Sequence, residues 1–327
     1  MTFKLSVLDQ SMARGRDQGA LALQETIEMA KWCETLGYER FWVSEHHAFP
    51  SVAGSVPEVL IAALGAATNH IRLGSGGIML PHYSAYKVAE VFSLLSNLYP
   101  NRIDLGVGRA PGADMNTARA LATDGRPKFE AFPQLVKKLG EYLWEDQTDP
   151  MVSPKPNEDI PIWILGSSPD SAQLAARLGL PYNLGAFINP QAQEQYIEFY
   201  QNNFQPSALW KTPYSMLTVS VFCADTEEQA KALQVTFDIN FYRFITGRTG
   251  GSFLTPQEAQ LFPITPELAD FMRSRDSLRA VGTPDQVKTK LTAIAQRFKV
   301  DELMMVSNMY YLEDRKRNFE LIMQEFN

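Results

Sequence analysis

Residues 41–47 read Phe41-Trp42-Val43-Ser44-Glu45-His46-His47, in which an apolar strand ends abruptly at one carboxylate and two imidazoles. The chain has only four histidines, and two of them are adjacent here. A neutral imidazole is the side chain best suited to moving protons near pH 7. This strand end is therefore the first candidate for a catalytic site.

The apolar run before His46 belongs to a pattern that extends over the whole chain. Short apolar runs alternate with longer amphipathic segments, which is typical of βα units and a parallel sheet. Eight strand–helix pairs without a linker between halves fit a closed barrel better than a doubly wound sheet. The predicted fold class is α/β, a (β/α)8 TIM barrel. The predicted strands cover residues 4–8, 40–44, 71–76, 103–107, 161–165, 182–186, 214–223 and 302–306.

Helix boundaries are marked by turn and cap residues. Gly37 follows the first predicted helix, Pro57 begins the second, and Thr283-Pro284-Asp285-Gln286 places a cap residue before a proline in the first turn. Further helices are predicted at 129–144, 170–178 and 226–244.

One long segment breaks the strand–helix rhythm. Residues 246–277 contain Gly247, Gly250, Gly251, Pro256, Pro263 and Pro266, and loops of this length in compact domains are often lids or binding loops. We therefore expect a single domain over residues 1–327, with a mobile lid inserted at 246–277 before the last helix–strand unit.

Composition excludes several classes of protein. The chain of 327 residues has a net charge of −7, whereas nucleic-acid binders usually present a basic face. Cys33 and Cys223 have no metal-ligand spacing and are expected to be reduced and inert. No apolar run has the length of a membrane span, and residues 1–10 do not resemble a signal peptide. We expect a cytoplasmic protein with neither a nucleic-acid nor a membrane partner.

Two groups at other strand ends could bind a phosphate. Gly166-Ser167-Ser168 precedes a helix, whose N-terminal N–H groups favour an anion. Arg109 follows the strand at 103–107 and would place a permanent positive charge at the same mouth. Each has a structural alternative: the serines could simply cap the helix, and Arg109 could form a structural salt bridge with an acidic neighbour such as Asp114. Their combination favours the phosphate site.

Other motifs near the strand ends are less specific. Gly106-Val107-Gly108-Arg109-Ala110-Pro111 lacks the third glycine of a dinucleotide fingerprint, so a Rossmann site is excluded. Gly76 and Gly77 could let the backbone approach a flat ligand, or could mark a bulge. His46 and His47 should point in opposite directions, so only one faces the mouth. A zinc site would need a third ligand, and His70 and His82 lie elsewhere without ligand spacing, so no metal is predicted.

Taken together, these motifs resemble those of the bacterial luciferase-like flavin monooxygenases, particularly the alkanal-monooxygenase-like single-chain subgroup. The resemblance runs almost from end to end. It is carried by Gly37-Tyr38, residues 42–47, residues 73–81, Gly106-Val107-Gly108-Arg109, residues 165–168, Leu178-Gly179-Leu180-Pro181 and Val281-Gly282-Thr283-Pro284.

The resemblance implies roles for the strand-end residues. It makes His46 the counterpart of the luciferase catalytic histidine. It aligns Arg109 and Ser168 with residues that hold the flavin phosphate, and Gly76-Gly77 with a non-prolyl cis peptide beneath the isoalloxazine. The predicted flavin site also includes Glu45, Gly166 and Ser167. Gly108 replaces the cysteine that luciferase places beside the flavin, and light emission is not predicted.

The resemblance also implies an activity. We expect an FMN-dependent two-component monooxygenase that takes reduced flavin from a separate reductase and uses O2 on a small hydrophobic, aldehyde-like substrate. The alternatives are a deazaflavin-dependent hydride-transfer oxidoreductase and a non-catalytic flavin-binding protein. A homodimer is expected, with the predicted helix at 83–98 as a candidate interface.

Overall fold

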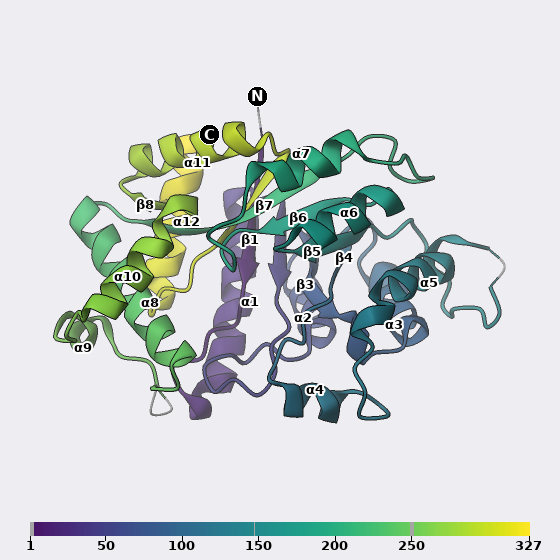
Figure 1. Cartoon of the computed structure of the whole chain (residues 1–327), viewed down its shortest axis with the longest axis horizontal. Helices are drawn as coiled ribbons and strands as arrows, with labels where there is room; N and C mark the ends of the chain where they lie inside the picture. The colour runs from purple at the N-terminus through teal and green to yellow at the C-terminus, as the bar shows by residue number, and fades with distance from the viewer. Residues whose placement is uncertain (1–2, 147, 249–251) are drawn as a thin grey trace.

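The computed structural model describes residues 3–146, 148–248 and 252–327, and its centre is a closed parallel barrel (Figure 1). Within these ranges the strands form one sheet of order β6-β5-β4-β3-β2-β1-β9-β7-β8, and all pairs are parallel. Because β6 also pairs with β7, eight strands close into a barrel. The strands are β1 (Lys4–Asp9), β2 (Arg40–Val43), β3 (Arg72–Met79), β4 (Ile103–Gly108), β5 (Ile162–Gly166), β6 (Tyr182–Gly185), β7 (Ser215–Cys223), β8 (Arg279–Gly282) and β9 (Glu302–Val306).

The predicted (β/α)8 barrel is confirmed, and each of the eight predicted strands is present. The sequence-based count missed β8, which lies outside the closed barrel. This short strand pairs with Ser220–Cys223, the second half of β7, while the first half of β7 pairs with β6 and β9. β7 is therefore long because it serves both the barrel and this extension.

Helices surround the barrel, and several begin or end at the expected residues. Gly37 ends α1 with a left-handed φ of 87°, Pro57 lies in the first turn of α2, and Thr283 forms a capping box before α11. The helices are α1 (Gly19–Leu36), α2 (Pro57–Ala67), α3 (Ala85–Leu98), α4 (Met115–Leu121), α5 (Phe132–Trp144), α6 (Pro169–Leu178), α7 (Glu194–Asn202), α8 (Glu227–Ile245), α9 (Pro256–Gln260), α10 (Pro266–Ser274), α11 (Pro284–Phe298) and α12 (Leu312–Phe326).

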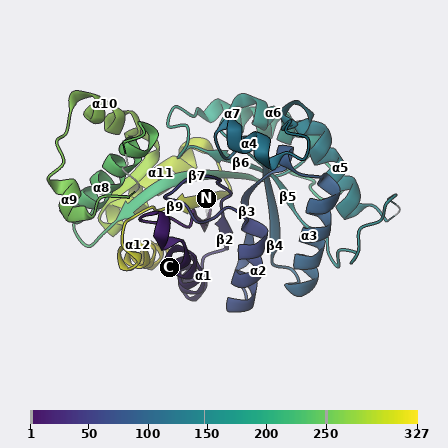
Figure 2. The ribbon, with the colours of Figure 1, turned by 90° about the horizontal axis from the view of Figure 1, so that it is seen from below.

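The segment predicted as a lid contains two helices rather than one long loop. Helices α9 and α10 lie with α8 at one end of the molecule, on the left of Figures 1 and 2. They pack through a small apolar cluster in which Ile239, Ala259 and Leu268 are buried. Residues 249–251 of the predicted lid lie outside the described residues. The single-domain assignment over 1–327 and the lid role of 246–277 stay predictions.

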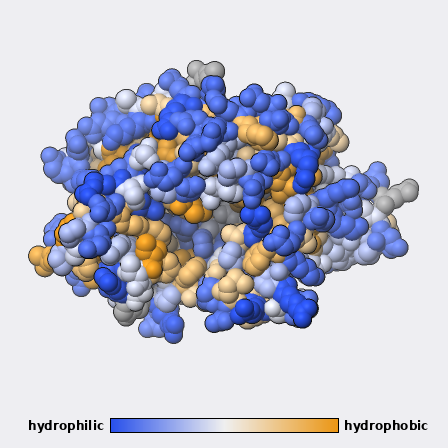
Figure 3. Space-filling view, in the orientation of Figure 1, coloured by the Kyte–Doolittle hydropathy of each residue, from blue (hydrophilic) through white to orange (hydrophobic). Residues whose placement is uncertain are grey.

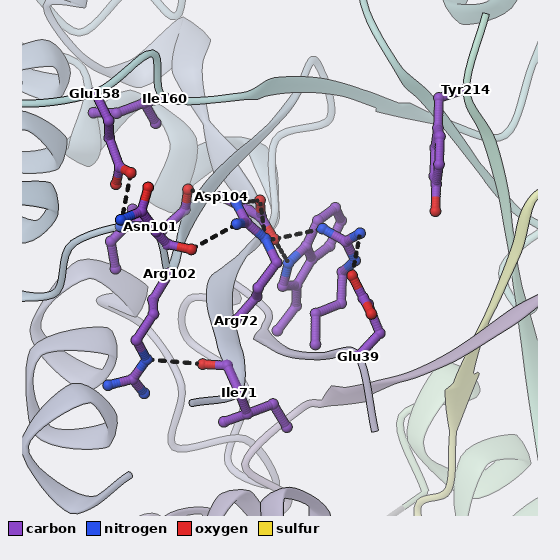
Figure 4. A network of polar contacts seen from close by, with 12 residues as sticks. Glu39, Ile71, Arg72, Asn101, Arg102, Asp104, Glu158, Ile160 and Tyr214 are labelled. Carbon is purple, nitrogen blue, oxygen red and sulfur yellow. Dashed lines mark hydrogen bonds and ion pairs between the residues drawn. The ribbon is translucent and has the colours of Figure 1, made fainter. Parts of the chain in front are cut away.

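The amino-terminal end of the barrel is filled by buried charges (Figure 4). Arg40, at the start of β2, donates to Glu302 at 2.7 and 3.0 Å and to Asp104 at 2.7 Å. Arg72 donates to the other oxygen of Asp104 at 2.5 Å, and the Tyr214 hydroxyl donates to Glu302 at 2.8 Å. The predicted site residues lie at the opposite end, where the strands terminate.

In the described part of the chain, no helix is both long and apolar enough to cross a membrane. The cytoplasmic location stays a prediction.

Candidate active site

Parallel strands bring the predicted site residues to one end of the barrel. His46 follows β2, Arg109 follows β4, and Ser167 follows β5. Active sites of (β/α)8 enzymes lie at this end.

His46 has an accessible ring in largely apolar surroundings. Its Nδ1 lies 3.0 Å from the Ser44 hydroxyl, and its Nε2 makes no hydrogen bond to any described residue. The Phe49 ring is tilted against the imidazole, with a centroid distance of 6.0 Å. Burial, which disfavours the imidazolium, is the main cause that holds the pKa of His46 below its ordinary value. The neutral ring can therefore accept a proton near pH 7.

His47 and Glu45 belong to a buried, hydrogen-bonded cluster. One Glu45 oxygen accepts hydrogen bonds from His47 Nε2 at 2.8 Å and from the Tyr83 hydroxyl at 2.7 Å. The other accepts from the Met79 backbone N–H at 2.9 Å. Both oxygens of Glu45 are thus engaged within the protein, and its carboxylate fixes the end of β3.

The glycines of β3 allow an unusually close approach of two strands. A Cβ on Gly77 would lie 2.6 Å from the carbonyl oxygen of Gly106 on β4. The peptide bond between Gly76 and Gly77 is cis, as the family resemblance implied. The β3–β4 register shifts between Ser75 and Ile78, so the bulge suggested as an alternative is also present.

The predicted phosphate ligands keep their polar groups available. Ser168 occupies the N-cap of α6, but its hydroxyl makes no capping hydrogen bond. The Ser167 carbonyl accepts from the Asn189 side chain at 2.9 Å, which ties the β5 end to the segment after β6. The donor set suited to a flavin phosphate consists of the Arg109 guanidinium, the Ser167 and Ser168 hydroxyls and the N-terminus of α6.

Arg109 lies beside an acidic neighbour, as the salt-bridge alternative expected, but that neighbour is Asp170 and not Asp114. Asp114 is the N-cap of α4, and its carboxylate accepts from the N–H groups of Asn116 and Thr117. Arg109 instead makes one long contact, 3.5 Å, to Asp170, and its side chain is 53% exposed. The guanidinium is therefore only weakly held by the protein itself.

An aromatic wall, which the sequence analysis did not identify, extends from His46. We define it as Phe49, Phe241, Phe244 and Phe271, all of which are partly exposed. Phe244 contacts Phe49 and Phe241 with centroid distances of 5.1 and 6.3 Å. The spacing of Phe237, Phe241 and Phe244 on one face of α8 was a readable signal. In Figure 3 apolar residues border a hollow near the middle of the face shown.

Four apolar or aromatic residues in or just after strands β3, β6 and β9 divide into two groups. Met79 and Met309 are buried and contribute to packing. Phe187 and Tyr310 are partly exposed, and Arg14 lies 5.4 Å from the Tyr310 ring centre.

Among the described residues, no group of three or more His, Cys, Asp or Glu side chains is arranged to hold a metal ion.

Comparison with known proteins agrees with this geometry. The model of the family described as luciferase-like monooxygenase matches residues 1–302. The chain belongs to the luciferase-like monooxygenase family. The crystal structure of apo-MsnO8 superposes with a TM-score of 0.92 at 37% identity, covering 99% of this chain and 98% of that one.

Curated relatives of this luciferase-like chain include proteins with functional names. One, named luciferase-like monooxygenase, from Escherichia coli (strain K12), is 35% identical over 98% of this chain and 96% of its own length. Another, N-acetyl-S-alkylcysteine monooxygenase from Bacillus subtilis (strain 168), is 34% identical over 98% and 97%. Both names support an oxidoreductase activity.

Proposed function

We propose that this protein is an FMN-dependent two-component monooxygenase that acts on a small hydrophobic substrate and receives reduced flavin from a separate reductase. The observation that carries the proposal is that two kinds of group lie at the same end of the barrel. One is the imidazole of His46, which favours its neutral form and lies beside the aromatic wall. The other is the set of polar groups suited to a phosphate, Arg109 and Ser168, which the protein itself holds only weakly. Reduced FMN, when bound, supplies the electrons that activate molecular oxygen.

Each part of the site has a defined task in this proposal. Arg109, Ser167 and Ser168 bind the flavin phosphate, with Gly166 supporting the turn into α6. Gly76 and Gly77 support the flavin ring, and Glu45 positions this stretch through the Met79 N–H. His46 holds or moves a proton at Nε2, while the aromatic wall binds the apolar substrate and excludes water.

Reduced-flavin titration tests both the cofactor and the phosphate site. We expect Arg109→Met to weaken the binding of reduced FMN by about tenfold. The variant loses a charge-assisted hydrogen bond to the phosphate, and the arginine side chain that makes this bond is partly exposed. The measurement is an anaerobic titration followed by absorbance. Arg119→Met, in the neighbouring helix α4, is the matched control and should bind like the wild type.

The same titration with a reduced deazaflavin separates the alternatives. Preference of the wild type for the deazaflavin would contradict the monooxygenase proposal and favour hydride transfer. Tight binding of reduced FMN without substrate-dependent oxygen consumption would favour a non-catalytic flavin-binding protein.

We also propose a homodimer through the outer faces of α2 and α3. Val59 on α2 and Leu94 and Leu98 on α3 are 67%, 51% and 55% exposed. The outward face of α2 continues with Ala63 and Ala66, so the two helices present an apolar surface that a second copy would cover.

Charge placed in this surface should separate the subunits. We expect Leu94→Glu to convert a dimer to a monomer at micromolar concentration, because each copy would bury an introduced carboxylate in the apolar interface. Sedimentation velocity is the measurement. Leu261→Glu, which alters an 87% exposed leucine after α9, is the control. A monomeric wild type would refute the proposed dimer.

A further inference from the structure

Arg275, just after α10, is a cation without an anionic partner among the described residues. Its guanidinium lies 4.8 Å from the ring centre of Phe241 and 5.5 Å from that of Phe271. Nη2 donates to the Phe187 carbonyl at 3.1 Å, whereas the buried Nε has no acceptor. Within residues 3–146, 148–248 and 252–327, no carboxylate forms an ion pair with Arg275.

The nearby acidic groups are already engaged by another arginine. Asp238 accepts hydrogen bonds from Arg279 at 2.8 and 3.1 Å, and Asp276 lies 3.9 Å from Arg279. Burial, followed by repulsion from Arg279, lowers the pKa of Arg275. A partly desolvated charge without a partner is costly, so this guanidinium is a suitable place for an anion from outside the protein.

The position of Arg275 connects this anion site with the candidate catalytic residue. Phe241 belongs to the aromatic wall, whose ring contacts continue through Phe244 and Phe49 to His46. Arg275 thus lies at the far end of an apolar surface that begins at His46. The rings of Phe241 and Phe271 lie against the Arg275 guanidinium. The edge of the guanidinium plane, which carries the N–H groups, is therefore the part suited to a carboxylate.

From this arrangement we propose that the substrate combines an apolar body, bound along the aromatic wall, with a carboxylate or similar planar anion bound by Arg275. This inference rests on the proposed function, which places the reacting end of the substrate at His46. The flavin phosphate is a different source of negative charge, but Arg109 and the serines after β5 provide a separate ligand set for it.

Octanoate and octan-1-ol are a probe pair that differ in the anionic group. We expect the wild-type protein to bind octanoate at least about tenfold more tightly than octan-1-ol in calorimetric titrations, since the carboxylate gains charge-assisted hydrogen bonds. Arg275→Met should abolish this preference, and Arg275→Lys should retain part of it. Arg273→Met is the matched control, because Arg273 lies on α10 and pairs with Asp270 at the surface.

Equal affinity of the wild type for the two probes would overturn the inference, as would an unchanged preference in a folded Arg275→Met protein. Reduced-FMN titration of the same variants separates the two anions. If Arg275→Met weakens the binding of reduced FMN but leaves the preference for octanoate over octan-1-ol intact, Arg275 binds the flavin phosphate and the inference fails. If the wild type does not bind reduced FMN but shows the Arg275-dependent preference, the proposed function fails and the anion site stands.

Discussion

Replacement of His46 by alanine is expected to slow product formation by about 10²–10⁴-fold, the usual contribution of a positioned acid–base group. The Nε2 atom of His46 makes no hydrogen bond within the part of the chain that the structure describes, and the ring borders the aromatic wall. The measurement is a single-turnover reaction of protein-bound reduced FMN with oxygenated buffer, with octanal as the probe substrate. Flavin absorbance and the product are both recorded.

Flavin binding provides the control for this prediction. His46 is assigned no contact with the phosphate, so the His46→Ala protein should bind reduced FMN with nearly wild-type affinity. His70→Ala removes an exposed imidazole and should leave both properties unchanged. A His46→Ala protein that forms product at the wild-type rate would refute the assigned role.

The pH profile gives a second readout for His46. Because its pKa lies below the ordinary value of about 6.5, the neutral, proton-accepting form should persist to a more acidic pH than in a free imidazole. The acid limb of the wild-type rate should therefore lie below this value. In His46→Ala this limb should disappear, whereas a limb caused by unfolding would remain.

The sequence was sufficient to place the main strand ends because fully buried parallel strands are continuous apolar runs. Residues 41–43 are such a run, residues 103–107 are apolar or glycine except for the ion-paired Asp104, and the polar residues that follow both strands lie at the mouth. By contrast, β8 has only four residues and pairs with one strand, so its local pattern is weak. Its existence depends on the long partner strand β7.

The helical content of the predicted lid could have been inferred from local signals. Thr255-Pro256-Gln257-Glu258 forms a capping box, and Thr265 caps α10 before Pro266. Threonine before proline at the first helical position is the pattern that correctly predicted the start of α11 at Thr283. Counting these prolines only as helix breakers led to the expectation of a long loop.

Contacts between distant side chains were not predictable in the same way. Tyr83 and Glu45 meet through a 2.7 Å hydrogen bond, and Arg275 reaches the carbonyl of Phe187. These contacts depend on how α3 and α10 pack against the barrel, and no spacing within the chain encodes them.

Replacement of Arg40 by methionine is expected to lower the free energy of unfolding by about 3–5 kcal/mol, because it leaves buried carboxylates without their main partner. Asp104, labelled in Figure 4, and Glu302 are fully buried at the amino-terminal end of the barrel. Arg40 forms an ion pair with each of them. Urea denaturation at pH 7 is the measurement. Lys87→Met, which breaks an exposed pair with Glu90, should cost less than about 1 kcal/mol.

The pH dependence distinguishes loss of charge pairing from loss of packing. Burial acts to raise the pKa of Asp104, but Arg40 and Arg72 outweigh it, so the wild-type pKa lies below its ordinary value. The stabilisation from this ionised group is thus present above the unfolded-state pKa of about 3.9 and is lost as pH falls through the lower folded-state value.

Without Arg40 the pKa of Asp104 should rise, so protonation on acidification should relieve part of the buried charge. We therefore expect the stability difference between wild type and Arg40→Met to narrow as the pH is lowered from 7 towards about 5. A difference that does not change with pH would attribute the loss to packing against Trp42 and Trp163, whose ring centres lie 5.9 and 5.0 Å from the guanidinium.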